Sequence, residues 1–391
     1  MLKSNRVSIT LLTELYLKQE IISCIYSHIG LSSNLNNNLI GVKSTPSNKK
    51  KIYSFTYVPD YITIVVFNSI KWTEKIFPSV NGYAISIDDN LSVDDYLRQK
   101  NKKQRENINR ALNRLETCFN VHYKMFQKNI EEEEYFFLMR HLKAMTIKRF
   151  EQRNQKSDSL TNWDKILSTS LALMKEGKAS LFVIYDKDLP IAISFNYIYS
   201  KLLFGYISSY NIDYYKFSLG HLIIYKLFEW CLDNQYAQYD MGWGDLDYKK
   251  LWCNNIYSFN HHILYPKYSI IGFLYALKHG NKSKILAFLI SKGVNKRFSR
   301  VKKKLKGNNR ITQKRLSYKF KKLTPTQFEQ LKGIDPLQKN LHITKQILND
   351  FLFLTQERSS NVLLYYSQIE NLYILKGKKE ARAILFNQSN H

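Results

Sequence analysis

Three apolar segments separated by very short polar turns constrain the fold of this chain more than any other feature. Residues 180–185 are apolar and rich in branched side chains, and residues 191–199 and 202–208 repeat that character. The turns between them, 186–188 and 200–201, are only a few residues long. Short polar turns of this kind join antiparallel neighbours. The pattern predicts a three-stranded antiparallel meander.

The segments after the meander predict a loop, a helix and two further strands. The loop covers residues 210–217, and Ser218 can cap a helix whose apolar residues recur at helical spacing. Residues 236–241 predict a short strand, and residues 259–264 predict a closing strand. Between these two strands the chain runs through a glycine-containing loop, 242–245, and a helical turn over Asp247 to Trp252.

Composition and pattern divide the whole chain into four regions, and further helices and strands are expected outside the segments described above. Their expected elements are helices over 11–29, 91–116, from 131, 163–176 and 269–305, and strands over 51–57, 61–67 and 121–126. The last 80 residues predict helices near 326–332 and 344–355 and strands near 362–366, 373–375 and 383–386. The expected domains are 1–90, 91–270, a basic helical segment 271–310, and a small α+β appendage 311–391.

Positive charge is concentrated in one stretch. The net charge is +27, and residues 248–328 contain 20 Lys or Arg and no Asp or Glu. A field of this sign attracts nucleic acid, anionic lipid or phosphorylated small molecules. The tract 278–322, with the apolar residues from 273 to 289, could lie on an anionic membrane. A scaffold helix followed by a charged linker explains the same tract.

Cysteine and histidine usage gives no metal-binding pattern. None of the four cysteines are spaced as CxxC, and Cys231 falls on the apolar stripe of a predicted helix, where we expect a buried thiol. His261 and His262 are expected to be structural or surface residues, and His221 a solvated residue of a helix cap. We expect no metal. The N-terminus lacks a signal-peptide pattern, and no apolar run reaches the ~18 residues of a membrane span. These features favour a cytoplasmic protein, with peripheral contact at the inner face of the membrane left open.

Two segments carry residue types suited to chemistry. Residues 217–220 could present the free N–H groups of a helix start to a pyrophosphate, with a glycine allowing close approach. Taken alone, this segment is better explained as an ordinary capped helix with a chance glycine. Residues 239–252, YDMGWGDLDYKKLW, combine glycine, acids, tyrosine and lysine. In this block a carboxylate could take a proton from an amine, and a tyrosine could protonate a leaving thiolate. For any single Asp here, turn formation is the alternative.

Four sequence blocks then resemble a known family. They are LRQKNKKQRENINRALNRLE, LFVIYDKDLPIAISF, SSYNIDYYKFSLGHLIIYKLFEWC and YDMGWGDLDYKKLW, which occur in this order between residues 97 and 252. Together they resemble the BioF2-like, CelD-type branch of the GNAT acetyltransferases, which is related to the FemABX aminoacyltransferases. The last block is the most specific. In the third block Leu219 replaces the family's proline, and the common GNAT phosphate loop is absent.

The resemblance implies an α/β (α+β) protein with a double GNAT-like fold, whose N-terminal half, 1–90, is degenerate. It implies transfer of an acyl group, such as acetyl, from acyl-CoA as co-substrate to an amine on a glycan precursor, with no tightly bound cofactor. Asp240, Asp245 and Tyr248 would then carry the proton transfers. The donor would contact Ser208, Ser209, Tyr210, Phe217, Ser218, Leu219 and Gly220, and the acceptor Trp243, Gly244, Lys249 and Trp252.

Two other functions stay open from the sequence. A FemABX-like enzyme would take its acyl group from aminoacyl-tRNA, which the basic charge permits. A non-catalytic adaptor would bind anionic lipid or nucleic acid in a salt-sensitive way and have no affinity for CoA.

Overall fold

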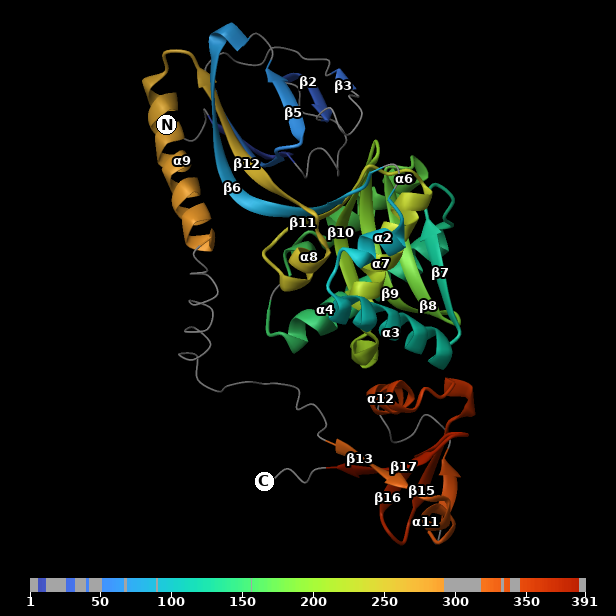
Figure 1. The fold of residues 1–391 in the computed structure, drawn as a ribbon. Helices are drawn as coiled ribbons and strands as arrows, with labels where there is room; N and C mark the ends of the chain where they lie inside the picture. Colours follow the sequence, from blue (N-terminus) through green and yellow to red (C-terminus); the bar gives the residue numbers. More distant parts are fainter. Residues whose placement is uncertain are drawn as a thin grey trace.

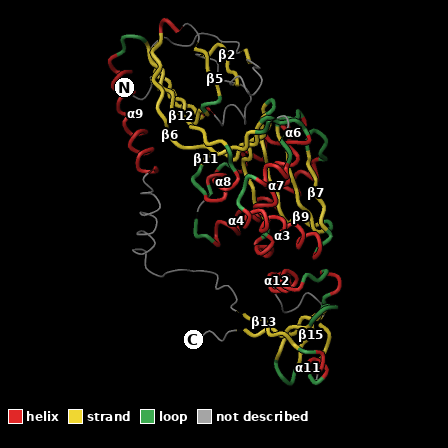
Figure 2. Tube along the Cα trace, viewed as in Figure 1, coloured by secondary structure: helices red, strands yellow, loops and turns green. Residues whose placement is uncertain are grey.

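A nine-stranded mixed sheet forms the centre of the computed structural model (Figures 1 and 2). In spatial order its strands are β1 (Arg6–Thr10), β4 (Ile52–Pro59), β12 (Asn255–Pro266), β6 (Trp72–Ser86), β11 (Gln238–Trp243), β10 (Leu202–Tyr210), β9 (Leu189–Tyr199), β8 (Ala179–Asp186) and β7 (Val121–Phe126). The structure describes residues 6–11, 26–31, 40–41, 51–66, 69–88, 91–155, 157–291, 318–331, 334–337 and 345–386.

The predicted meander is confirmed. β8, β9 and β10 pair in antiparallel register, and β10 then pairs in parallel with β11. Alternate residues of β8 enter two different cores: Leu181 and Val183 face one, while Phe182 and Ile184 face the other. Because both faces of the sheet are covered, β8 and β9 are buried along most of their length.

Helices cover the two faces of this part of the sheet. α4 (Glu132–Gln152) and α6 (Trp163–Lys175) pack on one face, whereas α3 (Lys102–Cys118) and α7 (Leu219–Asp233) pack on the other. The helix expected over 91–116 is divided into α2 (Val93–Arg98) and α3. The division has a local cause, because the Asn101 side chain accepts a hydrogen bond from the Gln104 amide and starts a new helix.

The sequence did not predict the long strand β6. It contains Pro78 and Gly82, which argue against a strand interior. The register between β6 and β12 shifts between Phe259 and Asn260, opposite Pro78, so a bulge accommodates the proline. β6 joins β12 on one side to β11 on the other. The sheet is therefore continuous across residue 90, where a domain boundary was expected.

Near the N-terminus, β2 (Tyr26–Leu31), β3 (Ile40–Gly41) and β5 (Ile62–Val66) form a small sheet. The helix expected over 11–29 is wrong at its end, because residues 26–29 belong to β2, and residues 12–25 lie outside the described residues. The shorter elements here and in the central domain are η3 (Ser69–Lys71), α5 (Asp158–Thr161), η4 (Ile212–Phe217) and α8 (Asp247–Trp252).

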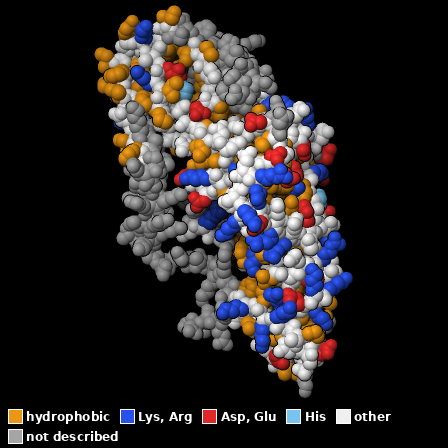
Figure 3. All heavy atoms as spheres, in the orientation of Figure 1, with side chains coloured by type: hydrophobic (Ala, Val, Ile, Leu, Met, Phe, Trp, Pro, Cys, Tyr) orange, Lys and Arg blue, Asp and Glu red, His pale blue; other side chains and the backbone are white. Residues whose placement is uncertain are grey.

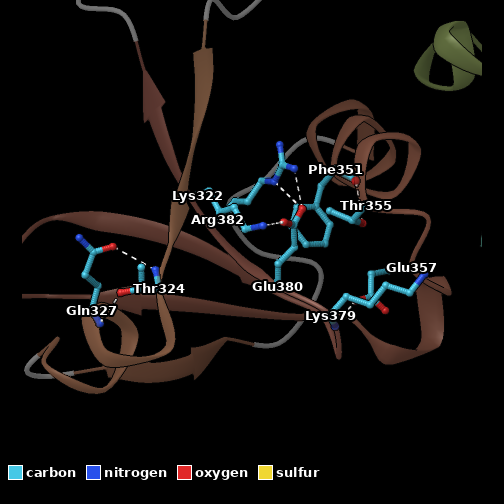
Figure 4. Close-up of polar contacts among 9 residues, drawn as sticks. All are labelled: Lys322, Thr324, Gln327, Phe351, Thr355, Glu357, Lys379, Glu380 and Arg382. Atoms are coloured by element: carbon cyan, nitrogen blue, oxygen red, sulfur yellow. Dashed lines mark hydrogen bonds and ion pairs between the residues drawn. The ribbon is translucent and has the colours of Figure 1, made fainter.

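The appendage forms a five-stranded antiparallel sheet. In spatial order its strands are β13 (Tyr318–Leu323), β17 (Ala381–Phe386), β16 (Leu372–Lys376), β15 (Leu363–Ser367) and β14 (Ile334–Leu337), with α11 (Pro325–Glu329), α12 (Lys345–Thr355) and η5 (Ser359–Asn361). Thr324 and Gln327 form a reciprocal cap on α11, and Glu380 pairs with Lys322 and Arg382 (Figure 4). The sequence predicted three of these strands and missed β13 and β14.

The appendage packs on the central domain through α12. Phe351 and Leu352 belong to the same core as α3 and α7, and Phe353 packs edge-on against Phe217 of η4 at 5.2 Å between ring centroids. At the opposite end of the molecule, α9 (Ile270–Ser291) lies beside β6 and β12 (Figure 1). Within the described residues, no helix is both long and apolar enough to cross a membrane.

Candidate functional site

A buried carboxylate lies at the centre of the 239–252 block. Asp240 in β11 has no exposed surface. Its Oδ2 accepts hydrogen bonds from the hydroxyls of Tyr61 and Tyr257, each at 2.6 Å, and its Oδ1 accepts one from the Gly242 amide at 2.6 Å. Burial raises the pKa of Asp240 to about 6, against the opposing effect of these hydrogen bonds. The carboxylate therefore positions two tyrosines and a turn, and it has no surface open to solvent.

Lys249 is the cation next to this carboxylate. Its side chain is 6% exposed, and its Nζ donates a hydrogen bond to the Trp243 carbonyl. Burial lowers the pKa of Lys249 to about 8, and the charge of Asp240 opposes that shift. Since Lys249 belongs to α8 and Asp240 to β11, their interaction ties the helix to the strand. We call Asp240, Tyr61, Tyr257 and Lys249 the carboxylate cluster.

The two glycines of the block are required by the backbone. Gly242 and Gly244 have φ angles of 70° and 107°, in a region that other residues avoid. They reverse the chain around Trp243, whose ring packs near Tyr57 and Phe259 at 5.1 and 5.8 Å between centroids. Trp243 is still 40% exposed. It therefore offers an exposed aromatic surface next to Lys249 of the carboxylate cluster, and its contact with a substrate stays a prediction.

Asp245 is a partly exposed acid of the block, and the neighbouring Asp247 is exposed. Its side chain is about one third exposed, its Oδ1 forms an ion pair with Lys250, and the Tyr83 hydroxyl donates to the same oxygen at 3.1 Å. Of the two acids expected to handle protons, Asp245 alone has exposed surface, whereas Asp240 is enclosed.

An arginine that the sequence analysis missed joins the meander to α8. The guanidinium of Arg149 in α4 lies 4.1 Å from the centre of the Tyr210 ring, and its Nη1 donates to the Ser208 carbonyl at 3.0 Å. Burial raises the pKa of Tyr248, and Arg149 and Arg153 lower it in part. We call Arg149, Tyr210 and Tyr248 the arginine cluster. No spacing rule points to Arg149, because it is one of several cations on an amphipathic helix.

The two parallel strands beside these clusters separate early. β10 and β11 pair at Leu202↔Gln238, Leu203↔Tyr239 and Phe204↔Asp240, and the ladder ends there, although β10 continues to Tyr210. A bulge between Gly205 and Ile207 also shifts the register of β10 against β9. Beyond Phe204, the β11 side of β10 therefore presents main-chain groups without a ladder partner among the described strands. Such an edge can bind an extended ligand.

The start of α7 partly follows the expectation. Ser218 occupies the N-cap position, but it has φ 54° and its hydroxyl makes no capping hydrogen bond, so the expected side-chain cap is wrong. A Cβ on Gly220 would lie 3.1 Å from the Tyr210 ring, so glycine lets the ring pack on the first turn. Phe217 and Leu219 are fully buried, which leaves only their backbone for a donor. Ser209 is also buried, and its hydroxyl has no partner.

A cavity of about 370 Å³ opens at the start of α7. Its lining comes from α3, η4, α7, α8 and α12: Asn101, Lys103, Gln104, Asn107, Ile108, Arg110, Ala111, Lys216, Ser218, His221, Leu251 and Phe353. Three of these side chains are cationic and none is acidic. Lys216 also forms an ion pair with Asp350 of α12 at 2.9 Å. We call this space the basic cavity.

His221 presents a neutral ring to the basic cavity. Trp252 Nε1 donates to His221 Nδ1 at 3.0 Å, and burial lowers the pKa of His221. Because Nδ1 accepts, the proton of the neutral ring is on Nε2. His221 is thus a partly buried, hydrogen-bonded residue and not the solvated one expected. Trp252 is fully buried, so its position corrects the expectation that it contacts a substrate.

The remaining histidine and cysteine expectations agree with the structure. His261 hydrogen-bonds Ser54 at 2.8 Å, and His262 pairs with Glu74 at 2.8 Å, which gives both histidines structural roles. Cys231 is a buried thiol whose pKa is raised by burial. In the described part of the chain, no group of three or more His, Cys, Asp or Glu side chains is arranged to hold a metal ion.

Comparison with known proteins identifies the central domain. Residues 102–250 match the model of an acetyltransferase (GNAT) domain, whereas no curated protein matches the chain. Among solved structures, similarity is found to FemX (TM-score 0.41, 11% identity, 58% of this chain and 74% of that one). It is also found to the C-terminal DUF2156 domain of a putative lysylphosphatidylglycerol synthetase from Agrobacterium fabrum (TM-score 0.36, 8% identity, 55% and 67%). A conserved protein of unknown function from Bacteroides thetaiotaomicron VPI-5482 gives TM-score 0.37 and 10% identity over 56% and 70%.

The matched residues contain the arginine cluster, Asp240 and Lys249 of the carboxylate cluster, and most of the lining of the basic cavity. Residues 102–250 match a GNAT acetyltransferase domain, in agreement with the family that the sequence resembles. Similarity to solved structures at these TM-scores carries no argument about donor or acceptor.

Proposed function

We propose that this protein transfers an acyl group from acyl-CoA to an amine on a glycan precursor. The observation that carries the proposal is the early separation of β10 and β11 inside a GNAT-type domain, with the arginine cluster beside the part of β10 that has no β11 ladder partner. In this arrangement the extended thioester arm of the donor lies along β10. Its phosphates lie toward the start of α7, whose free N–H groups and neighbouring cations favour negative charge.

The proposed reaction is attack by the amine nitrogen on the thioester carbonyl, which breaks the carbon–sulfur bond and releases a thiolate. Asp245 takes the proton that the amine loses, because its carboxylate is partly exposed and lies in the loop between Trp243 and α8. Tyr248 gives its proton to the thiolate. Its raised pKa keeps the hydroxyl protonated at neutral pH, and the nearby Arg149 stabilises the tyrosinate that forms. The carboxylate cluster holds the turn that carries Trp243.

One observation favours a second candidate, transfer from aminoacyl-tRNA. The exposed side of α3 carries Lys102, Lys103, Arg105, Arg110 and Arg114 beside the basic cavity, which suits a polyanion larger than CoA. Lys and Arg are also prominent on this part of the surface in Figure 3.

A thiol-release assay with acetyl-CoA over a panel of amino sugars tests the proposal. We expect thiol release that depends on the amino sugar and is lost in Tyr248→Phe. The control is Tyr225→Phe in α7, which packs on the same face of the sheet as α3, and this variant should retain thiol release. Calorimetry with CoA and with charged tRNA separates the two donors. Binding of charged tRNA without any binding of CoA would overturn the acyl-CoA proposal in favour of the second candidate.

A further inference from the structure

The helix α9 places its smallest residues inward and its largest apolar residues outward. Gly272, Ala276 and Gly280 recur every four residues and are buried against the sheet. A Cβ on Gly272 would lie 2.5 Å from Tyr265, and one on Gly280 would lie 2.1 Å from Phe77. The small stripe lets the helix backbone approach β6 and β12 closely. The apolar surface that usually stabilises a helix on a sheet is therefore turned away from it.

The outward face of α9 is strongly apolar. Its exposed large side chains, with their exposed fractions, are Ile270 (75%), Ile271 (57%), Phe273 (46%), Leu274 (58%), Leu277 (43%), Ile285 (60%) and Phe288 (60%), and Tyr268 just before the helix is 90% exposed. Figure 3 shows hydrophobic side chains gathered at the end of the molecule where Figure 1 places α9. A contiguous apolar surface of this kind marks an interaction site.

The charged residues around the apolar face of α9 indicate which kind of partner it can bind. Lys267, Lys278 and Lys282 are exposed next to the apolar residues, and the sequence has no Asp or Glu between 248 and 328. A second copy of the chain would bring cations against cations. Nucleic acid would use the lysines but leave the isoleucines and leucines without a partner. An anionic bilayer accepts both, because aliphatic side chains enter the boundary of the acyl chains while lysines reach the head groups.

We propose that α9 lies flat on the surface of a bilayer that contains anionic lipid. In this pose the apolar face of α9 enters the lipid boundary, and Lys267, Lys278 and Lys282 contact the head groups. The close packing of Gly272 and Gly280 on the sheet fixes the orientation of the whole domain on the surface. This binding does not depend on the acyl-transfer reaction.

Vesicle co-sedimentation of the full chain tests the proposal. We expect the protein to pellet with vesicles of phosphatidylglycerol and phosphatidylcholine in equal parts, and to stay in solution with phosphatidylcholine alone. Phe273→Ser with Leu274→Ser should weaken binding about tenfold. Lys278→Gln with Lys282→Gln should weaken it about fivefold per lysine at low salt. Circular dichroism checks that each variant is folded.

The matched control is Leu363→Ser with Ile369→Ser, which removes two side chains of the appendage that are 50% and 69% exposed. This variant should bind vesicles like the unaltered protein. Absence of binding to both kinds of vesicle, or equal binding by all variants, would overturn the proposal. So would a dimer in analytical ultracentrifugation that the Phe273 and Leu274 substitutions dissociate.

Discussion

The carboxylate cluster and the basic cavity stand on opposite sides of α8 and are built in opposite ways. In the carboxylate cluster both oxygens of Asp240 accept hydrogen bonds from the protein, and Asp240 and Lys249 are almost fully enclosed. In the basic cavity the cations line about 370 Å³ of open space, and Lys103 and Arg110 are exposed.

The difference indicates different contributions to a reaction. Groups whose hydrogen bonds are complete before a ligand arrives give fixed geometry, and their loss is expected in kcat. Groups that face an open cavity gain partners only when a ligand binds, so their loss is expected in KM. The arginine cluster lies between these cases, because Arg149 already binds the Ser208 carbonyl while its Nε has no partner.

The largest effect is expected for Asp240→Asn. The amide group of asparagine would face either the two tyrosine hydroxyls or the Gly242 N–H, and in both cases a buried donor loses its acceptor. We expect kcat to fall by about 10²–10³, with little change in the KM of the donor. Steady-state kinetics measures this split. Asp188→Asn, in an exposed turn, is the control. A variant with normal kcat would show that the cluster is only a packing element.

A smaller loss is expected for Arg149→Met, which preserves the aliphatic stem but removes the guanidinium. The Tyr210 ring and the Ser208 carbonyl then lose their cationic partner, and the tyrosinate of Tyr248 loses its stabilisation. We expect kcat to fall by about tenfold to a hundredfold, and the loss should be much smaller when Tyr248→Phe is already present. Additive losses in this double-mutant cycle would contradict a shared role.

Substitutions in the basic cavity should change the KM of the donor. Lys216→Ala removes a cation that lines the cavity and leaves Asp350 without its ion pair. We expect the KM of the donor to rise about tenfold with kcat unchanged. Phe353→Leu, in the wall contributed by the appendage, should raise it less. Lys175→Ala, exposed on α6, is the control. A change in kcat without a change in KM would move the donor site elsewhere.

The smallest effect concerns pH. Activity should fall as pH drops below about 6, since a protonated Asp240 no longer accepts from both tyrosines. Lys249→Met should move this limb of the pH–activity profile upward by about one pH unit, because the lysine charge lowers the pKa of Asp240.

The free energy of unfolding should depend on pH in the opposite direction to activity. The pKa of Asp240 in the folded protein lies above its ordinary value of 3.8, so its contribution to stability is fully present below that pH and is lost as pH rises through about 6. Denaturant unfolding of the protein and Asp240→Asn across this range measures the difference.

Local patterns in the sequence were sufficient to predict much of the fold. The meander, the helix after Ser218, the helical turn Asp247–Trp252 and most of the appendage were predicted, because alternation, helical spacing and turn residues act over a few positions. The 15-residue strand β6 was not predicted. Its proline and glycine argue against a strand, and only the bulge in the distant β12 explains how they fit.

The candidate site also has some features that are local in the sequence and others that depend on contacts between distant segments. The sequence was sufficient to single out the 239–252 block, because its two glycines, three aspartates and two lysines lie within one strand end, one loop and one helical turn. Only the tertiary structure decided that Asp240 is enclosed by Tyr61 and Tyr257, that Arg149 reaches β10, and that α12 closes one wall of the basic cavity. The hydrogen bond between Tyr61 and Asp240 alone joins segments 179 positions apart. The formation of these contacts depends on how the helices and strands pack, which no short-range pattern encodes.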